Sequence, residues 1–454
     1  MENGMRLRES LSSGLRNNMI IDIKNNTGTA DVVPDAEMNN AGWIQQEIDK
    51  CSSDGGGRVV IPRGVFRCGR IRLRSRVELH LEAGAVLLCS EDYKDILRPE
   101  GDRHDTPSAF IWAKDEEDVT ITGQGVIDGN GRSYVAENLP HIYVMKKARP
   151  RMFALFGCKR LTISGITIRD SAEWSLWMCG CDSVLISDIR LFNDLKIPNA
   201  DGIGIDRCKN VTISGCHIVA GDDAIVLKAT RGPEREAYGG IENIIVQGCN
   251  LKSTSSAIVI GCEIAAPVRN VVFDSCVISS SHRGLSINHS FESDIENVVF
   301  SNMLVETRIF DRLWWGNGEP IYVKAMPWTE ADVVGKIRNV TFRNIQAKSE
   351  NGIVIWGEKA DRIQDVRFEN VRLNLVKWSK YAGGEMDLRP CPGGENGFAA
   401  AVFKHPIHAL MLHHATDIRI DSFELEVDQG SGFDYHGPME IVDVQGLRIN
   451  NLST

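Results

Sequence analysis

One phrase of about nine residues recurs along most of the chain, and this repeat constrains the fold more than any other feature. Typical copies are RLTISGITI from Arg160 and NVTISGCHI from Asn210. Further copies begin at Asp118, Ser183, Asn243, Asn270, Asn297, Asn339, Asp365, Asp417 and Gly446. Apolar and polar residues alternate within each copy, which predicts strands, and Gly, Asn, Asp and Ser predict the turns between them.

The spacing of the copies indicates how the strands are arranged. Between Arg160 and Asn297 successive copies begin 23 to 33 residues apart, without helical periodicity between most of them. Strands at this interval predict stacked coils, joined by right-handed connections for steric reasons. We therefore expect an all-β fold, a single-stranded right-handed parallel β-helix. The alternative is a β-propeller, which fits poorly because each blade needs about 40 residues or more.

The ends and the longer intervals predict the domain organisation. Residues 39–53 have helical spacing of apolar side chains, which predicts a short N-terminal capping helix. Longer intervals after Asn297 and Asp365 indicate insertions. The prediction is one β-helix domain over 1–454, with an N-terminal segment and cap over about 1–58, coils over 59–454, and loop insertions near 306–338 and 374–416.

The net charge and the hydropathy of the chain limit the classes of molecule that it is expected to bind. The formal net charge of −10 argues against nucleic acid, which needs concentrated Lys and Arg. An apolar run long enough to cross a membrane is missing, so we expect no membrane partner. The N-terminus shows no signal-peptide core, which predicts a cytoplasmic protein, or a secreted or periplasmic one if a leader has been removed. The oligomeric state is unknown at this stage.

The twelve cysteines show no metal-binding spacing, so we expect neither a metal nor another cofactor. Cys216, Cys249 and Cys276 each follow by six residues the Asn that opens a repeat. We expect these thiols to be small buried apolar groups, with disulfides or reactivity as the alternative.

The segment from Asn199 to Ala229 carries the most informative polar residues. Asp222 and Asp223 follow Asp201 by 21 and 22 residues. In a coil of that length Asp222 is expected about one turn above Asp201, and stacked strands lie about 4.8 Å apart. Three carboxylates at such distances raise at least one pKa, so one carboxyl stays protonated near neutral pH. A protonated acid beside ionised carboxylates suits glycosidic cleavage. Calcium binding, lyase chemistry and ordinary turns remain alternatives at this point.

The sequence resembles glycoside hydrolase family 28, the polygalacturonase-like family. The resemblance covers most of residues 27–305 and rests on GTAD, GGGRVVIPRGVF, LHLEAGAVLL, DSAEWSLWMCGCDSV, NADG and AGDDAIVLK. It implies an inverting, single-displacement hydrolysis. Asp222 would be the general acid, Asp201 and Asp223 would hold and deprotonate the water, and Asn199 would orient its neighbours.

Two motifs of that family are altered. Where the family has Gly-His-Gly, this chain has Ser255 and Ser256 and no His. Where the family has Arg-Ile-Lys, whose cations grip a uronate carboxylate, this chain places Ser286 and Asn288. Because a buried uronate needs a charge-assisted partner, we expect the sugar specificity to differ from that of ordinary polygalacturonases.

Other side chains are candidates for binding sugar. Lys228 and Arg283 could bind substrate or lie at a solvated coil edge. Trp314 and Trp315 form a candidate platform for pyranose rings, in an insertion where Glu319 could accept hydroxyl hydrogen bonds. Glu263 is a further candidate for substrate contact.

The predicted function is a polygalacturonase-like glycosidase that hydrolyses pectin-derived poly- or oligosaccharides and acts, on one interpretation, from a chain end. The alternatives are a polysaccharide lyase and a non-catalytic carbohydrate-binding β-helix. A lyase is disfavoured because the paired aspartates have no strong base beside them in the sequence.

Overall fold

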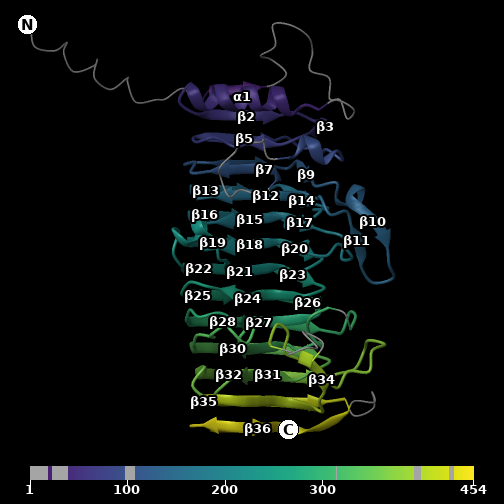
Figure 1. Cartoon of the computed structure of the whole chain (residues 1–454), viewed down its shortest axis with the longest axis vertical. Helices are drawn as coiled ribbons and strands as arrows, with labels where there is room; N and C mark the ends of the chain where they lie inside the picture. The colour runs from purple at the N-terminus through teal and green to yellow at the C-terminus, as the bar shows by residue number, and fades with distance from the viewer. Residues whose placement is uncertain are drawn as a thin grey trace, which may run out of the picture.

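The computed structural model describes residues 19–22, 39–97, 108–312, 314–392, 400–428 and 434–453. Parallel strands wind through these residues as stacked coils along one long axis (Figure 1). The parallel β-helix predicted from the repeat is therefore confirmed, and the propeller is excluded. The GTAD segment (28–31) and most of the predicted N-terminal segment lie outside the described residues.

Three ladders of strands run along the coils. The first ladder, which carries the candidate site, comprises β4 (Ile71–Arg72), β7 (Ala109–Lys114), β12 (Arg151–Phe156), β15 (Leu176–Cys179), β18 (Ile203–Asp206), β21 (Ile225–Ala229), β24 (Ser256–Ile264), β27 (Arg283–His289), β29 (Ile321–Ala325) and β31 (Ile353–Gly357). The second comprises β1 (Met19–Asp22), β2 (Gly57–Ile61), β5 (Val77–Leu81), β8 (Thr120–Gly123), β13 (Lys159–Ser164), β16 (Asp182–Ser187), β19 (Lys209–Ser214), β22 (Ile241–Gln247), β25 (Val268–Asp274), β28 (Ile295–Thr307), β30 (Ile337–Ser349) and β32 (Ile363–Leu375).

The third ladder is built from shorter strands: β3 (Gly64–Cys68), β6 (Ala85–Cys89), β9 (Val126–Asp128), β14 (Thr167–Arg169), β17 (Arg190–Phe192), β20 (His217–Ala220), β23 (Asn250–Ser253) and β26 (Val277–Ser281). In the last coils the long strand β35 (Ile407–Val427) continues both the first and the second ladder, and β36 (Tyr435–Gln445) and β37 (Arg448–Ser453) pair with it.

The Asn that opens several of the repeats has a conformational role. Asn210, Asn243, Asn270 and Asn297 have φ between 53° and 59°, a left-handed conformation that Asn tolerates better than most residues. The side-chain amide of Asn243 donates to the Asn210 oxygen at 3.0 Å, and the amides of Asn270 and Asn297 continue the chain at 3.2 Å each. The repeated Asn therefore turns the backbone and links neighbouring coils.

The core consists of inward side chains stacked from coil to coil. Phe273, Phe300, Phe342 and Phe368 stack face to face with ring centroids 4.8, 4.9 and 5.3 Å apart. Cys216, Cys249 and Cys276 are buried free thiols just before β20, β23 and β26, as the sequence predicted. Burial of this column away from water is the main stabilising contribution to such a solenoid.

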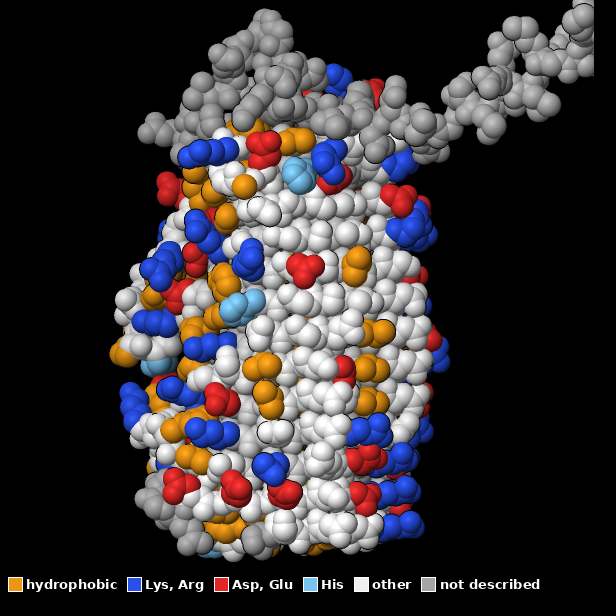
Figure 2. Space-filling model, turned by 180° about the vertical axis from the view of Figure 1, so that it is seen from behind, with side chains coloured by type: hydrophobic (Ala, Val, Ile, Leu, Met, Phe, Trp, Pro, Cys, Tyr) orange, Lys and Arg blue, Asp and Glu red, His pale blue; other side chains and the backbone are white. Residues whose placement is uncertain are grey.

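The outer surface repeats with the coils as well. Seen from behind, Figure 2 shows apolar side chains in vertical files and, toward the C-terminal end, acidic and basic side chains alternating in a file. Exposed pairs between neighbouring coils include Arg343 with Glu369 and Arg372 with Glu424, each at 2.6 Å. Such exposed pairs contribute little stability individually.

Helix α1 (Ala41–Ser53) covers the first coil, as predicted for the cap, and buries Ile44, Ile48 and Cys51 (Figure 1). The remaining helical turns are α2 (Pro233–Glu236), η1 (Tyr93–Asp95) and η2 (Gly131–Tyr134). Within the described part of the chain, none of these helices is long and apolar enough to cross a bilayer.

Two antiparallel hairpins project from the coils: β10 (Val135–Asn138) with β11 (Tyr143–Met145), and β33 (Glu385–Asp387) with β34 (Val402–Lys404). The first was not anticipated from the sequence. The second lies in the predicted insertion 374–416, which also contains the start of β35. The predicted insertion 306–338 holds first-ladder strand β29, so a strand of the solenoid divides it into two loops.

Candidate active site

A cavity of about 480 Å³ lies over the first ladder. Its wall includes Asp201, Asp222, Asp223, Lys228, Glu263 and Arg283, so four acidic and two basic side chains face it. The apolar and aromatic part of the wall comprises Ile142, Trp174, Pro198, Val259, Trp314, Trp315 and Trp328. This combination of a few polar groups with aromatic walls is typical of a small-ligand site.

Strand register brings the aspartates together. Ile203 of β18 lies opposite Ile225 of β21, so Asp201 and Asp223, each two residues earlier, occupy equivalent positions on adjacent coils. The amide of Gly202 donates to the Asp223 carbonyl at 2.8 Å, which fixes this alignment. The sequence spacing had placed Asp222 above Asp201, but the structure places Asp223 there, with Asp222 beside it.

Asp222 is held by backbone amides. The amide of Asn199 donates to Oδ2 at 3.2 Å, and the amide of Asp223 donates to Oδ1 at 3.0 Å. Burial and the neighbouring Asp223 carboxylate raise the pKa of Asp222 to about 7, although Lys228 and the two amides act in the opposite direction. Asp222 therefore keeps a proton near neutral pH.

Asp201 is the most buried of the three aspartates, with 4% of its surface exposed. Among the described residues, no hydrogen-bond donor contacts its Oδ1 atom. Burial and the Asp222 carboxylate hold the pKa of Asp201 well above its usual value, and Lys228 counteracts part of this shift. The Asp201–Asp222 pair thus resists full ionisation.

Asp223 is positioned by the altered coil that follows it. The Ser255 hydroxyl donates to Oδ1 at 2.8 Å, and the Ser256 amide donates to the same atom at 3.0 Å. These two donors fix the orientation of the carboxylate. The serines that replace the family's Gly-His-Gly motif therefore support the aspartate cluster directly.

Asn199 lies at the cavity wall with a φ of +57°. Its side-chain oxygen accepts a hydrogen bond from Nη2 of Arg149 at 2.9 Å. Arg149 also donates to the carbonyls of Ala172 and Pro198 and so braces the loop before Asp201. Sequence reasoning missed Arg149, because it belongs to no repeat and lies fifty residues from Asn199.

Lys228 and Glu263 form an ion pair at the wall, with Nζ and Oε2 3.3 Å apart. The Nζ atom also lies 4.8 Å from the ring centre of Trp174. Desolvation lowers the pKa of Lys228, but Glu263, Asp201 and Asp223 together raise it above its usual value. Lys228 is therefore a fixed cation beside the carboxylates.

Trp314 and Trp315 both line the cavity, where the sequence analysis placed a sugar platform. Trp315 lies edge-on to Trp328 with ring centres 6.5 Å apart. The loop is anchored from below, because the Gly316 amide donates to Asp387 at 2.7 Å and Arg389 donates to the Trp314 carbonyl at 2.8 Å. Trp174 and Trp328 also line the cavity.

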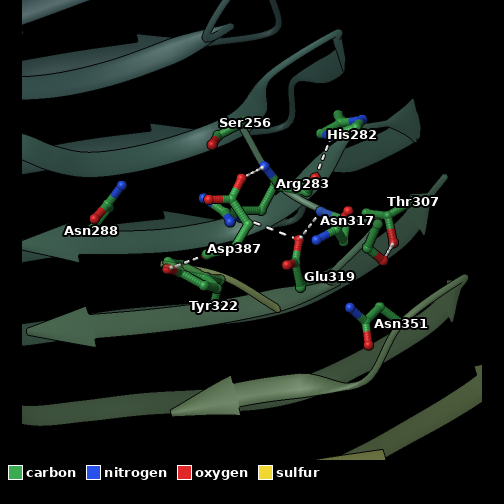
Figure 3. Close-up of polar contacts among 12 residues, drawn as sticks. Ser256, His282, Arg283, Asn288, Thr307, Asn317, Glu319, Tyr322, Asn351 and Asp387 are labelled. Carbon is green, nitrogen blue, oxygen red and sulfur yellow. Dashed lines mark hydrogen bonds and ion pairs between the residues drawn. The ribbon is translucent and has the colours of Figure 1, made fainter. Parts of the chain in front are cut away.

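Arg283 and Glu319 form a buried pair beneath the cavity (Figure 3). The Nε atom of Arg283 lies 3.3 Å from Oε2 of Glu319, which also accepts from the Asn317 amide at 2.8 Å. The guanidinium lies 3.6 Å from the ring centre of Tyr322. Arg283 reaches the cavity wall, and in the described residues its Nη2 has no hydrogen-bond partner.

The prediction that Glu319 accepts hydroxyl hydrogen bonds from a sugar is wrong for this structure. Its side chain is fully buried and does not line the cavity, because the coil places it behind Arg283. Glu319 instead holds Arg283 in position. Its carboxylate compensates the charge of the buried guanidinium, which would otherwise be unfavourable away from water.

The two positions that align with the family's Arg-Ile-Lys motif provide no cation. Asn288 lines the cavity and donates to the Arg389 carbonyl at 3.3 Å, whereas Ser286 is fully buried. Lys324 lies opposite Asn288 on the next coil. Its Nζ is buried and donates to the carbonyls of Leu388, at 3.2 Å, and Pro390, so it does not line the cavity.

The fold and the site define a parallel β-helix protein with a carboxylate cluster in a cavity over its first ladder. The chain belongs to glycosyl hydrolases family 28, whose model matches residues 51–382. It is 29% identical over 235 residues to a probable polygalacturonase of Vitis vinifera, an alignment covering 49% of this chain and 48% of that protein. The chain thus spans about half the length of that curated relative.

Solved structures share the fold. A family 28 exopolygalacturonase of Yersinia enterocolitica superposes with a TM-score of 0.67 and 20% identity, over 95% of this chain and 78% of that one. An exopolygalacturonase of Thermotoga maritima superposes with a TM-score of 0.58 and 21% identity, over 94% and 92% of the two chains.

Proposed function

We propose that this protein is a glycoside hydrolase that cleaves glycosidic bonds in pectin-derived chains or oligosaccharides by a single displacement. The observation that carries the proposal is the group of three carboxylates on adjacent coils at the wall of an aromatic cavity, where burial and the Asp223 carboxylate raise the pKa of Asp222 to about 7. Membership of family 28 and similarity to a probable polygalacturonase support the choice of substrate class.

Each aspartate has a role in the proposed reaction. Asp222 gives its proton to the glycosidic oxygen as the bond from that oxygen to the anomeric carbon breaks. A water oxygen attacks the same carbon from the opposite face and gives its proton to Asp223, while Asp201, whose pKa is held well above its usual value, helps to hold that water. The product then has the opposite anomeric configuration, because only one displacement occurs. Asn199 orients Asp222 through its backbone amide.

The cations at the wall support an altered sugar specificity. The positive charge of Lys228 is compensated by the ion pair with Glu263, and the Nε atom of Arg283 is paired with Glu319. Nη2 of Arg283 has no hydrogen-bond partner among the described residues, but it is buried, so it provides little charge-assisted contact to a uronate carboxylate. We therefore propose a substrate with fewer buried uronates than unmodified polygalacturonate, such as a fragment that carries neutral sugars.

The ends of the cavity support action at a chain terminus. Ile142, from the loop between β10 and β11, lines the wall, as do Trp314, Trp315 and Trp328 from the loops around β29. These projecting loops bound the cavity from both directions along the solenoid. A cavity of this volume holds one or two sugar rings rather than a long continuous chain.

The side chains that line the cavity support lyase chemistry less well than hydrolysis. A lyase needs a strong base that can lose its proton, whereas Lys228 has a raised pKa and Arg283 is paired with Glu319. Ultraviolet absorbance from an unsaturated product would contradict hydrolysis.

A panel of pectic fragments tests the proposal. We expect reducing-end release from at least one fragment bearing neutral sugars to exceed that from polygalacturonate by about tenfold or more, because each missing charge-assisted contact weakens transition-state binding. Chromatography of timed digests should show products of one or two sugars. Equal rates on polygalacturonate and on every other fragment would contradict the altered specificity, and release from none would contradict the hydrolase.

A further inference from the structure

A cluster of histidines with one glutamate lies on the last coils, apart from the cavity. His405 follows β34, His413 belongs to β35 and Glu440 to β36. Their ligand atoms all lie within 4.8 Å of one another, and none of the three residues lines the cavity. The proposed hydrolysis makes no use of them.

Two distances in the cluster are close to those between neighbouring ligands of a metal ion. Nε2 of His405 lies 3.0 Å and Nε2 of His413 lies 3.1 Å from the same oxygen of Glu440. In a tetrahedral zinc site with bonds of about 2.0–2.1 Å, neighbouring ligand atoms are roughly 3.3 Å apart. The two contacts to Glu440 are already close to this spacing, and all three ligand atoms lie within 4.8 Å of one another, so side-chain adjustments would bring them around one ion.

Surrounding groups set the orientation of both imidazoles. The Pro406 carbonyl can only accept, so its contact of 2.8 Å assigns a hydrogen to Nδ1 of His405 and leaves Nε2 toward Glu440 as the ligand atom. The His413 ring stacks on Trp356, with centroids 3.9 Å apart and planes 20° from parallel. Histidines that bind a metal through one ring nitrogen commonly donate a hydrogen bond from the other, as Nδ1 of His405 does here, and this bond fixes the orientation of the ring.

A fourth ligand is within reach. Nδ1 of His408 lies 3.9 Å from the same Glu440 oxygen. This nitrogen is buried and has no hydrogen-bond partner among the described residues, which is costly unless a further group is bound. We propose that His405, His408, His413 and Glu440 bind one divalent cation of the zinc class. The ion would link the loop before β35, strand β35 and the final coil, and so stabilise the C-terminal end of the solenoid.

Zinc binding to the full-length protein tests this inference. The purified chain is stripped with a chelator, dialysed against Zn²⁺ and assayed for bound metal and for Tm. We expect about one Zn²⁺ per chain and, at a hundredfold excess over Kd, a rise in Tm of about 3 °C. Bound Co²⁺ should show the strong visible absorption of a tetrahedral site.

Variants separate this site from other zinc binding. Glu440→Gln keeps the shape of the side chain and removes a charged ligand, so it should weaken Zn²⁺ binding by about tenfold or more and abolish the rise in Tm. His217→Gln, an exposed histidine on β20, is the matched control and should bind as the wild type does. His408→Gln tests the fourth ligand. Absence of Zn²⁺ from the wild type, or equal binding by Glu440→Gln, would overturn the inference whether or not the hydrolase proposal holds.

Discussion

Replacing Asp222 with asparagine is expected to lower kcat by about 10²–10⁴ on the best substrate of the panel, with KM little changed. Asparagine keeps the size of the side chain and can still contact the Asn199 amide, but it carries no proton that it can transfer. The loss falls on kcat because proton transfer to the leaving oxygen occurs only in the transition state. Initial rates over a range of substrate concentrations measure the effect.

The matched control is Asp188→Asn, an exposed aspartate in the turn after β16. It should retain wild-type kcat and Tm. The Asp222→Asn variant should also keep its Tm or gain stability, because the substitution removes a carboxylate whose ionisation is opposed by burial and by Asp223. An Asp222→Asn enzyme within about threefold of wild type would contradict the role of general acid.

Replacing Arg283 with methionine is expected to lower the free energy of unfolding by about 3–5 kcal/mol. The substitution leaves the Glu319 carboxylate fully buried without its counter-ion, because the two side chains are 2% and 0% exposed. It also removes the cation from the face of Tyr322. Equilibrium unfolding in urea, followed by circular dichroism and tryptophan fluorescence, measures the loss.

Two further variants isolate the buried pair. Arg269→Met breaks the exposed contact with Glu242 at 3.0 Å and should cost less than about 1 kcal/mol. Arg283→Met combined with Glu319→Leu should be more stable than Arg283→Met alone, because no unpaired charge remains buried. If the double variant were no more stable than the single one, the loss would come from packing and not from the unpaired carboxylate.

The fold could be predicted from the sequence because each repeat reports the same local structure. The Asn at the start of a copy marks a left-handed turn, and the alternation after it marks two strands, so spacing alone predicts stacked coils. Spacing also predicted that Asp201, Asp222 and Asp223 lie near one another. It placed Asp222 rather than Asp223 above Asp201, because a shift of one residue in a turn leaves the repeat length almost unchanged.

The parts of the site that come from loops could not be predicted in the same way. Trp328 lines the cavity and Arg149 holds Asn199 at its wall, both from segments without periodicity, so nothing in the sequence fixes where their side chains point. Glu319 was misassigned because it follows a Gly-rich loop but belongs to the coil position beneath Arg283. The supporting contact from Asp387 to the tryptophan loop joins residues 71 positions apart.

The pH dependence of kcat/KM tests the central claim most directly. The acid form of Asp222 is the active one, and its pKa is raised to about 7, so kcat/KM should fall about tenfold per pH unit above that value. The fall in kcat/KM above pH 7 should disappear in Asp222→Asn, because the residual rate of this variant needs no proton from residue 222. Two results would contradict a proton held by the three aspartates. One is a wild-type kcat/KM that stays constant for about two pH units on either side of 7, and the other is a fall above pH 7 that is unchanged in Asp222→Asn.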